Sequence, residues 1–290
     1  MQAQVQSWVD DFHDACAAPT DFAKLKNLMS KRVTVENPGE PKCKKFEDWE
    51  KKAKDVYAAY KSAKRTTPKG APTIALPAKK EEVDCITPQL CTFVWTKDLA
   101  ELYPSVNLSN GDKSKILIYD RYTLSGKNEC SWYSPLFNPI DFKNADRTDD
   151  DDTWAHGLYR AMNEPEGDKL AKLLADNLVV EYPGQPKMNK DQWLEFTKNF
   201  KSQTHELFLS PVVGIADKDG VSEGVVAVKR SFKWSAALND AFKVEFAEDA
   251  AVEIKAYDNI KVKDGKLVYL MPAFNPAVNI KPAGGKGAGN

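Results

Sequence analysis

The chain has 290 residues, 42% of them hydrophobic, which is enough material for two domains that each bury a core. Its 41 basic and 42 acidic residues are interspersed, and this balance argues against the basic stripe typical of nucleic-acid-binding proteins. No stretch has the length and hydrophobicity of a membrane span, and the first residues lack a secretory signal pattern. We therefore expect a soluble cytoplasmic protein, or an organellar one if a targeting peptide has been removed.

The first predicted elements are helices. Trp8, Phe12 and Cys16 recur at the spacing of one helical face, so this face of the first helix is expected to meet a core. A second, short helix follows. An extended segment then ends at the Pro-Gly turn of residues 38–39, and a third helix begins near Trp49.

After the third helix the hydrophobic period changes to two, which is typical of strands. Residues 66–88 are predicted as a long loop region. Beyond it, Ile116, Ile118, Tyr122 and Leu124 share one face of a strand by strict alternation. The pattern therefore predicts helices first and an antiparallel sheet after them.

The second half of the chain repeats this order, with strand patterns at 226–234 and 254–262 and an Asp-Gly hairpin turn at 264–265. Residues 35–41 read Val-Glu-Asn-Pro-Gly-Glu-Pro, and residues 180–186 read Val-Glu-Tyr-Pro-Gly-Gln-Pro. Other landmarks match in the same order: Trp8 with Trp154, Trp49 with Trp193, Asp120 with Asp258, and Phe137 with Phe274.

Because a fixed order of matching landmarks indicates an internal repeat, we predict two copies of one domain. The first covers residues 1–140 and the second covers residues 154–279. The acid-rich residues 141–153 are predicted to link them, and the glycine-rich residues 280–290 are predicted to be disordered.

The cysteines and histidines do not form a metal motif. All five cysteines lie in the first half, at positions whose counterparts are partly apolar, and are interpreted as small core residues. Cys85 and Cys91 are the alternative, a disulfide in an oxidising compartment. The three histidines are widely separated in the sequence, so we expect neither a metal nor another cofactor.

The order of elements, the Val-Glu-x-Pro turn and the Asp-Gly-Lys-Leu hairpin resemble the SnoaL-like branch of the nuclear-transport-factor-2-like superfamily. Residues 174–183 are similar to the segment around the base of ketosteroid isomerase. The resemblance implies an α+β fold: two tandem cone-shaped α+β barrels, each with N-terminal helices packed in a curved antiparallel sheet. Because such folds host enzymes, binding proteins and assembly modules, the resemblance alone does not give the function.

An acid occurs on the apolar face of a strand in each half, at Asp120 and Asp258. Because a buried carboxylate without a partner is costly, each of them needs a partner or a proton. The resemblance implies a protonated acid that donates to an oxyanion. The alternative is a structural ion pair with Arg230, which shares the apolar face of the preceding strand, whereas the first half has no arginine at the comparable place.

The sequence departs from the isomerase where its base would stand. That position holds Asn37 in one half and Tyr182 in the other, and neither accepts a proton near neutral pH. The helical tyrosine of the isomerase aligns with Phe12 and Leu158. His13 and Tyr159 follow one place later and would replace it after a small shift in register.

These observations predict a small-molecule-binding protein whose ligand is apolar, like a polyketide, steroid or carotenoid, in a pocket of one or both domains. The alternatives are an isomerase, cyclase or dehydratase that uses a pocket acid, and a noncatalytic scaffold. We expect a monomer with internal pseudo-twofold symmetry, or a homodimer. The catalytic candidates are Asp120, Asp258 and His205. The ligand-binding candidates are His13, Asn37, Asp120, Tyr122, Tyr159, Tyr182, Arg230, Phe232, Trp234, Asp258 and Phe274.

Overall fold

The computed structural model describes residues 2–17, 19–38, 40–59, 62–78, 81–102, 108–138, 153–164 and 168–283. The chain divides into two compact units. The first comprises Met1–Thr148 with Val212–Ile215, and the second comprises Asp149–Pro211 with Ala216–Asn290. Of the predicted acidic linker, only Thr153 is among the described residues.

The first unit contains helices and strands in the order helix, helix, strand, helix, then mainly strands. They are α1 (Gln2–Cys16), α2 (Phe22–Leu28), β1 (Met29–Val35), α3 (Phe46–Ala58), β2 (Ala63–Thr66), β3 (Ile74–Pro77), β4 (Val83–Val94), α4 (Lys97–Leu102), β5 (Lys113–Leu124) and β6 (Cys130–Leu136). The short strand β10 (Val212–Val213) also groups with this unit.

The second unit begins with the same order of elements. Its elements are α5 (Trp154–Asn163), α6 (Asp168–Leu173), β7 (Leu174–Val180), β8 (Met188–Asn189), α7 (Lys190–Thr197), β9 (Lys201–Leu207), β11 (Val221–Lys233), α8 (Ala237–Phe242), β12 (Ala251–Lys263), β13 (Lys266–Ala273), α9 (Pro276–Asn279) and β14 (Ile280–Pro282).

Each unit builds one sheet, and the strands follow the same order in both. The first sheet runs β1-β6-β5-β4-β2, with β3 also paired to β4. In the second sheet the corresponding path is β7-β13-β12-β11-β9, with β8 beside β7 and β14 beside β12. The fold is therefore mixed α+β with two sheets, as the sequence predicted at this level.

The sheets differ from the sequence prediction in two respects. The pairs β1-β6 and β7-β13 are parallel, so neither sheet is purely antiparallel. Hydrophobic alternation reports which residues share a face and carries no information on strand direction. The predicted loop at 66–88 also contains β3, which pairs antiparallel with β4.

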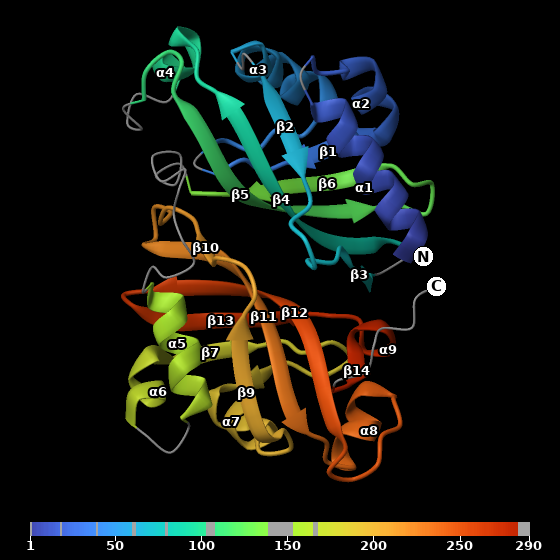
Figure 1. Ribbon diagram of the computed structural model, residues 1–290, viewed down its shortest axis with the longest axis vertical. Coiled ribbons are helices and arrows are strands. Elements are labelled where there is room, and N and C mark those ends of the chain that lie inside the picture. Colours follow the sequence, from blue (N-terminus) through green and yellow to red (C-terminus); the bar gives the residue numbers. More distant parts are fainter. Residues whose placement is uncertain are drawn as a thin grey trace. The chain divides into compact units, whose positions relative to one another are not determined.

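The helices cover one face of each sheet with the predicted apolar stripes. Trp8, Phe12 and Cys16 of α1 are buried, and the ring of Trp8 packs edge-on against Tyr122 of β5. Phe12 packs in the same way on Tyr133 of β6. Figure 1 shows α1 lying across this sheet. The contact places the end of α1 next to the middle of β5, where Asp120 lies.

The structure decides between the two interpretations of the cysteines. All five cysteines are buried and free, which agrees with their interpretation as core residues. Cys85 and Cys91 both lie on the extended strand β4, roughly 20 Å apart at its rise per residue, so the alternative of a disulfide between them is wrong.

The predicted disordered tail starts too early, because Ile280–Pro282 form β14 against β12, while residues 284–290 lie outside the described part. Among the described residues, no helix is long and apolar enough to span a membrane.

Two glycines in different backbone conformations, Gly265 in the β12–β13 hairpin and Gly157 in α5, predict opposite effects of alanine. Asp264 and Gly265 both have positive φ, as a two-residue type I′ turn requires. We expect Gly265→Ala to lower the free energy of unfolding by about 1 kcal/mol, because an L side chain is disfavoured there. Gly157, inside α5, has open space around it, so Gly157→Ala should raise that free energy by about 0.5–1 kcal/mol. Urea unfolding of both variants checks this, and two changes of the same sign would contradict it.

Candidate functional site

Two buried carboxyl groups occupy the same position in the two sheets. Asp120 lies on β5 between Thr87 of β4 and Pro135 of β6. Asp258 lies on β12 between Val226 of β11 and Pro272 of β13. Both side chains are fully buried on the apolar face that strand alternation predicts. Each must therefore find its partners inside its own unit.

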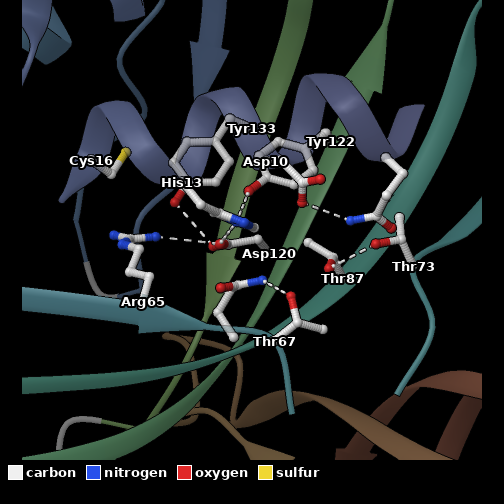
Figure 2. A network of polar contacts seen from close by, with 12 residues as sticks. Asp10, His13, Cys16, Arg65, Thr67, Thr73, Thr87, Asp120, Tyr122 and Tyr133 are labelled. Atoms are coloured by element: carbon white, nitrogen blue, oxygen red, sulfur yellow. Dashed lines mark hydrogen bonds and ion pairs between the residues drawn. The ribbon is translucent and has the colours of Figure 1, made fainter. Parts of the chain in front are cut away.

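Asp120 has a partner on each oxygen (Figure 2). Its Oδ2 lies 3.0 Å from Nε2 of His13 and 3.4 Å from Nη1 of Arg65. Its Oδ1 accepts a hydrogen bond of 3.0 Å from the hydroxyl of Tyr133. The three donors come from α1, β2 and β6, so this carboxyl group connects the helix to strands on either side of β5.

The electrostatics of this cluster favour an ionised Asp120 and a neutral His13. Burial alone would raise the pKa of Asp120, but the hydrogen bond from His13 and the charge of Arg65 hold it below its usual value. Burial lowers the pKa of His13, although Asp120 opposes this effect. The neutral imidazole must then carry its proton on Nε2, because this nitrogen faces the carboxylate. Nε2 also lies 3.0 Å from the hydroxyl of Tyr122.

Asp258 is less completely satisfied. The hydroxyl of Tyr159 and Nη2 of Arg230 both donate to Oδ2, whereas Oδ1 has no hydrogen-bond partner among the described residues. Burial raises the pKa of Tyr159, so its hydroxyl keeps its proton and acts as a donor. Nε and Nη1 of the buried Arg230 also lack an acceptor within the described part of the chain. The predicted ion pair is thus present, and it leaves polar groups unused.

The cation reaches the carboxyl group from a different strand in each unit. On the first sheet Arg65 of β2 stands opposite Cys91 of β4. On the second sheet His205 of β9 stands opposite Arg230 of β11. The arginine is therefore on the outer strand in the first unit, opposite Cys91, and on the inner strand in the second, opposite His205. The first unit has no arginine on β4, the strand comparable to β11, as the sequence indicates, and Arg65 of β2 takes this role beside Asp120.

Each unit contains a cavity beside its carboxyl group, and the two cavities differ in size. The first has a volume of about 110 Å³ and is lined by residues that include Asn37, Arg65 and Tyr133. The second has a volume of about 610 Å³, and its lining includes Tyr182, His205 and Arg230. The larger space thus lies beside the carboxyl group with fewer partners.

His205 and Tyr182 meet the second cavity in their neutral forms. Burial, and secondarily the charge of Arg230, lower the pKa of His205 to about 3. Its Nδ1 lies 2.8 Å from Oδ1 of Asn163, an acceptor, so the ring proton is on Nδ1 and Nε2 is a lone-pair acceptor. Burial raises the pKa of Tyr182, whose hydroxyl therefore stays protonated at neutral pH.

Other predicted site residues do not line either cavity. His13, Asp120 and Tyr122 form the internal network of the first unit, while Tyr159 and Asp258 lie behind Arg230.

Three predicted ligand-binding aromatic residues also lie away from the cavities. Phe232 packs on Phe200 and Trp234 with ring centroids 4.9 and 5.9 Å apart. Phe274 packs on Phe242 at 5.5 Å. These rings fill the core of the second unit because aromatic side chains bury large areas against one another.

Arg65 is a site residue that the sequence patterns do not predict. Its strand has four residues and comes directly before the predicted loop at 66–88, although Ala63 and Arg65 alternate in burial with Lys64 and Thr66. Among the described residues, no group of three histidine, cysteine or acidic side chains is arranged to hold a metal ion.

Comparisons with known proteins give structural neighbours only. No family pattern and no curated protein matches the sequence. The solved structures similar to it include a SnoaL-like protein from Jannaschia sp. CCS1, with 8% identity, a TM-score of 0.36 and coverage of 46% of this chain and 85% of that one. An NTF2-like protein of unknown function from Burkholderia pseudomallei shows 6% identity and a TM-score of 0.37, covering 51% of this chain and 100% of the other. An LEH-like epoxide hydrolase from M. tuberculosis shows 14% identity and a TM-score of 0.30, covering 42% and 75%.

The network around Asp120 predicts a large loss of stability when its charge is removed. Asp120→Asn should lower the free energy of unfolding by about 3 kcal/mol, because Arg65, whose side chain is 11% exposed, loses its counter-charge. The control is Asp84→Asn on β4, an exposed acid that accepts from Thr123, which should change that energy by less than about 0.5 kcal/mol. Urea unfolding of both variants tests the difference. Equal effects would mean that Asp120 contributes no more than a surface acid.

The lowered pKa of His205 predicts that the stability of the fold depends on pH. Its pKa is about 3 in the folded protein and is expected near 6.5 in the unfolded chain, so below about pH 6.5 the unfolded state binds one more proton. Stability should therefore fall on acidification, by up to about 1.4 kcal/mol per pH unit from this residue. We expect His205→Gln to reduce the slope of unfolding free energy between pH 6.5 and pH 4. A slope unchanged from wild type would show that His205 is not held neutral by the fold.

Proposed function

We propose that the chain is a tandem of two SnoaL-like units, and that the second unit binds a small, largely apolar molecule in its cavity. The tandem is supported by the repeated Val-Glu-x-Pro turn and by the shared strand order and register around Asp120 and Asp258. This would make the two units copies of one ancestral domain that have since diverged in their interiors.

The observation that carries the binding function is the cavity of about 610 Å³ in the second unit. Small-molecule sites in proteins commonly measure roughly 300–1,000 Å³ and combine an apolar wall with a few polar groups. Met162, Leu170, Phe200 and Leu270 supply the apolar wall here, and Arg230 is the buried polar group. A cavity of this size and composition suits a ligand better than a packed core.

The first unit lacks these features. Its cavity is about 110 Å³, and its carboxyl group already accepts from His13, Arg65 and Tyr133. A ligand group that entered there would have to displace an existing hydrogen bond, which leaves a buried donor unpaired. We therefore assign the first unit a supporting role and place binding in the second.

The catalytic alternative finds less support in the second cavity. An isomerase needs a group that accepts a proton from the substrate. Tyr182, at the position of the isomerase base, stays protonated, and a pKa of about 3 makes His205 a weak base. The side chains that meet the cavity are therefore better suited to holding a molecule than to moving a proton.

Binding of the neutral fluorescent dye Nile red tests this function. We expect the wild-type protein to enhance the dye's fluorescence with a saturable isotherm. Leu194→Trp, on α7 at the edge of the second cavity, should weaken binding by about tenfold because the added ring occupies the space.

The matched control is Val56→Trp, on α3 at the smaller cavity of the first unit, which should leave dye affinity within about twofold. Circular dichroism of both variants verifies that they fold. If wild type shows no saturable binding, or if only Val56→Trp weakens it, the proposed function is wrong, and the first of these outcomes favours a noncatalytic scaffold.

A further inference from the structure

Arg230 is a buried cation with unused hydrogen-bond donors. Its side chain is 3% exposed, and only Nη2 has an acceptor, Oδ2 of Asp258. A guanidinium group has five N–H bonds, and the three on Nε and Nη1 have no acceptor among the described residues. Arg230 lines the second cavity, but these two nitrogens are themselves buried, so an acceptor that enters from there reaches them only when the guanidinium turns toward it.

Unused donors of this kind are unfavourable in a folded protein. A buried N–H group without an acceptor has lost its hydrogen bonds to water without replacement, and the loss is greater when the group is charged. Asp258 meets Arg230 through the one oxygen that Tyr159 also uses, and its other oxygen, Oδ1, contacts no donor among the described residues. The arrangement gains most from a partner that brings its own acceptor oxygens into the cavity.

The charged side chains that line the cavity are basic, and Arg230 has its counter-charge in Asp258 behind it. Besides Arg230, the lining residues within the described part include Lys198 and Lys201 and no aspartate or glutamate. His205, the titratable neighbour opposite Arg230, is neutral, so it neither adds charge nor repels an anion. The two lysines pair with Glu195, Glu248 and Asp249 and are at least partly exposed, which leaves Arg230 as the buried cation among these three.

We propose that the second cavity selects a ligand that carries one carboxylate, which accepts hydrogen bonds from Arg230 while an apolar body packs on Phe200 and Leu270. This inference rests on the proposed function and names the ligand class. A carboxylate brings two acceptor oxygens to the unused N–H groups, and arginine binds planar carboxylates with strong charge-assisted hydrogen bonds. Asp258 does not line the cavity, so the ligand and Asp258 would use different N–H groups of the same guanidinium.

Two probes with the same apolar body, one with a charged carboxylate and one with its neutral methyl ester, test the ligand class on the wild-type protein. They are 11-(dansylamino)undecanoic acid and its methyl ester. We expect the acid to bind at least about tenfold more tightly than the ester, as a charge-assisted hydrogen bond to a buried cation implies. Both should displace Nile red. Equal affinities, or tighter binding of the ester, would overturn the inference.

A double variant tests whether Arg230 is the receiving residue. Arg230→Gln alone leaves Asp258 buried without its counter-charge and is expected to fold poorly, so it is combined with Asp258→Asn. In this variant the preference for the acid should fall to within about twofold, while the affinity for the ester stays close to wild type. The acid and ester comparison on wild type remains decisive if the variant does not fold.

The control neutralises an equivalent pair beside the first. Lys229 directly precedes Arg230 on β11, so its side chain points to the opposite face of the sheet. It pairs with Glu206 of β9. The variant with Lys229→Gln and Glu206→Gln should keep the preference for the acid. Loss of the preference here, or its survival in the Arg230 variant, would place the carboxylate elsewhere and overturn the inference. If Nile red binds and neither probe displaces it, the ligand class is wrong but the proposed function stands, whereas absence of Nile red binding removes both.

Discussion

A carboxyl group buried on the apolar face of each sheet imposes the main constraint on this structure. A charge in that position must be matched by donors from the same unit, since water does not reach it. The helix that crosses each sheet supplies one of these donors, His13 in the first unit and Tyr159 in the second. A cation on the same sheet supplies another, Arg65 two strands away in the first unit and Arg230 on the adjacent strand in the second. The carboxyl group thus fixes the position of the helix on the sheet as well as the identity of nearby residues.

The two units meet this constraint to different degrees, and the difference separates structure from function. Asp120 has three donors on its two oxygens and lies beside a cavity of about 110 Å³. Asp258 has two donors on one oxygen and lies behind a cavity of about 610 Å³. In each unit one terminal nitrogen of the arginine meets the carboxyl group. The other terminal nitrogen of Arg65 donates to the hydroxyl of Tyr57, whereas Nε and Nη1 of Arg230 have no acceptor among the described residues.

Much of this arrangement could be predicted from the sequence. The period of two places Asp120 and Asp258 on the buried face. On the first helix of each unit, the residues that meet these acids are His13 and Tyr159, one place after the residues that align with the isomerase tyrosine. Arg230 was identified as a partner because it is on the apolar face of an adjacent strand. These conclusions depend only on local periodicity, which is a property of the sequence itself.

The remaining features depend on contacts that periodicity does not encode. Arg65 lies on a four-residue strand whose pairing with β4 is set by tertiary structure, so its approach to Asp120 could not be predicted. Alternation places Phe232 and Trp234 on the buried face but does not say whether that face meets a cavity or other rings. The difference in cavity volume arises from the packing of many side chains together, and no single motif reports it.

The most direct measurement is a crystal structure of the protein grown with dodecanoate, at a resolution that defines the partners of both buried arginines. The account predicts a carboxylate in the second unit within hydrogen-bond distance of Nε or Nη1 of Arg230, and an Asp120 cluster in the first unit that contacts no ligand. A second cavity filled by its own side chains, with protein acceptors on every nitrogen of Arg230, would contradict it.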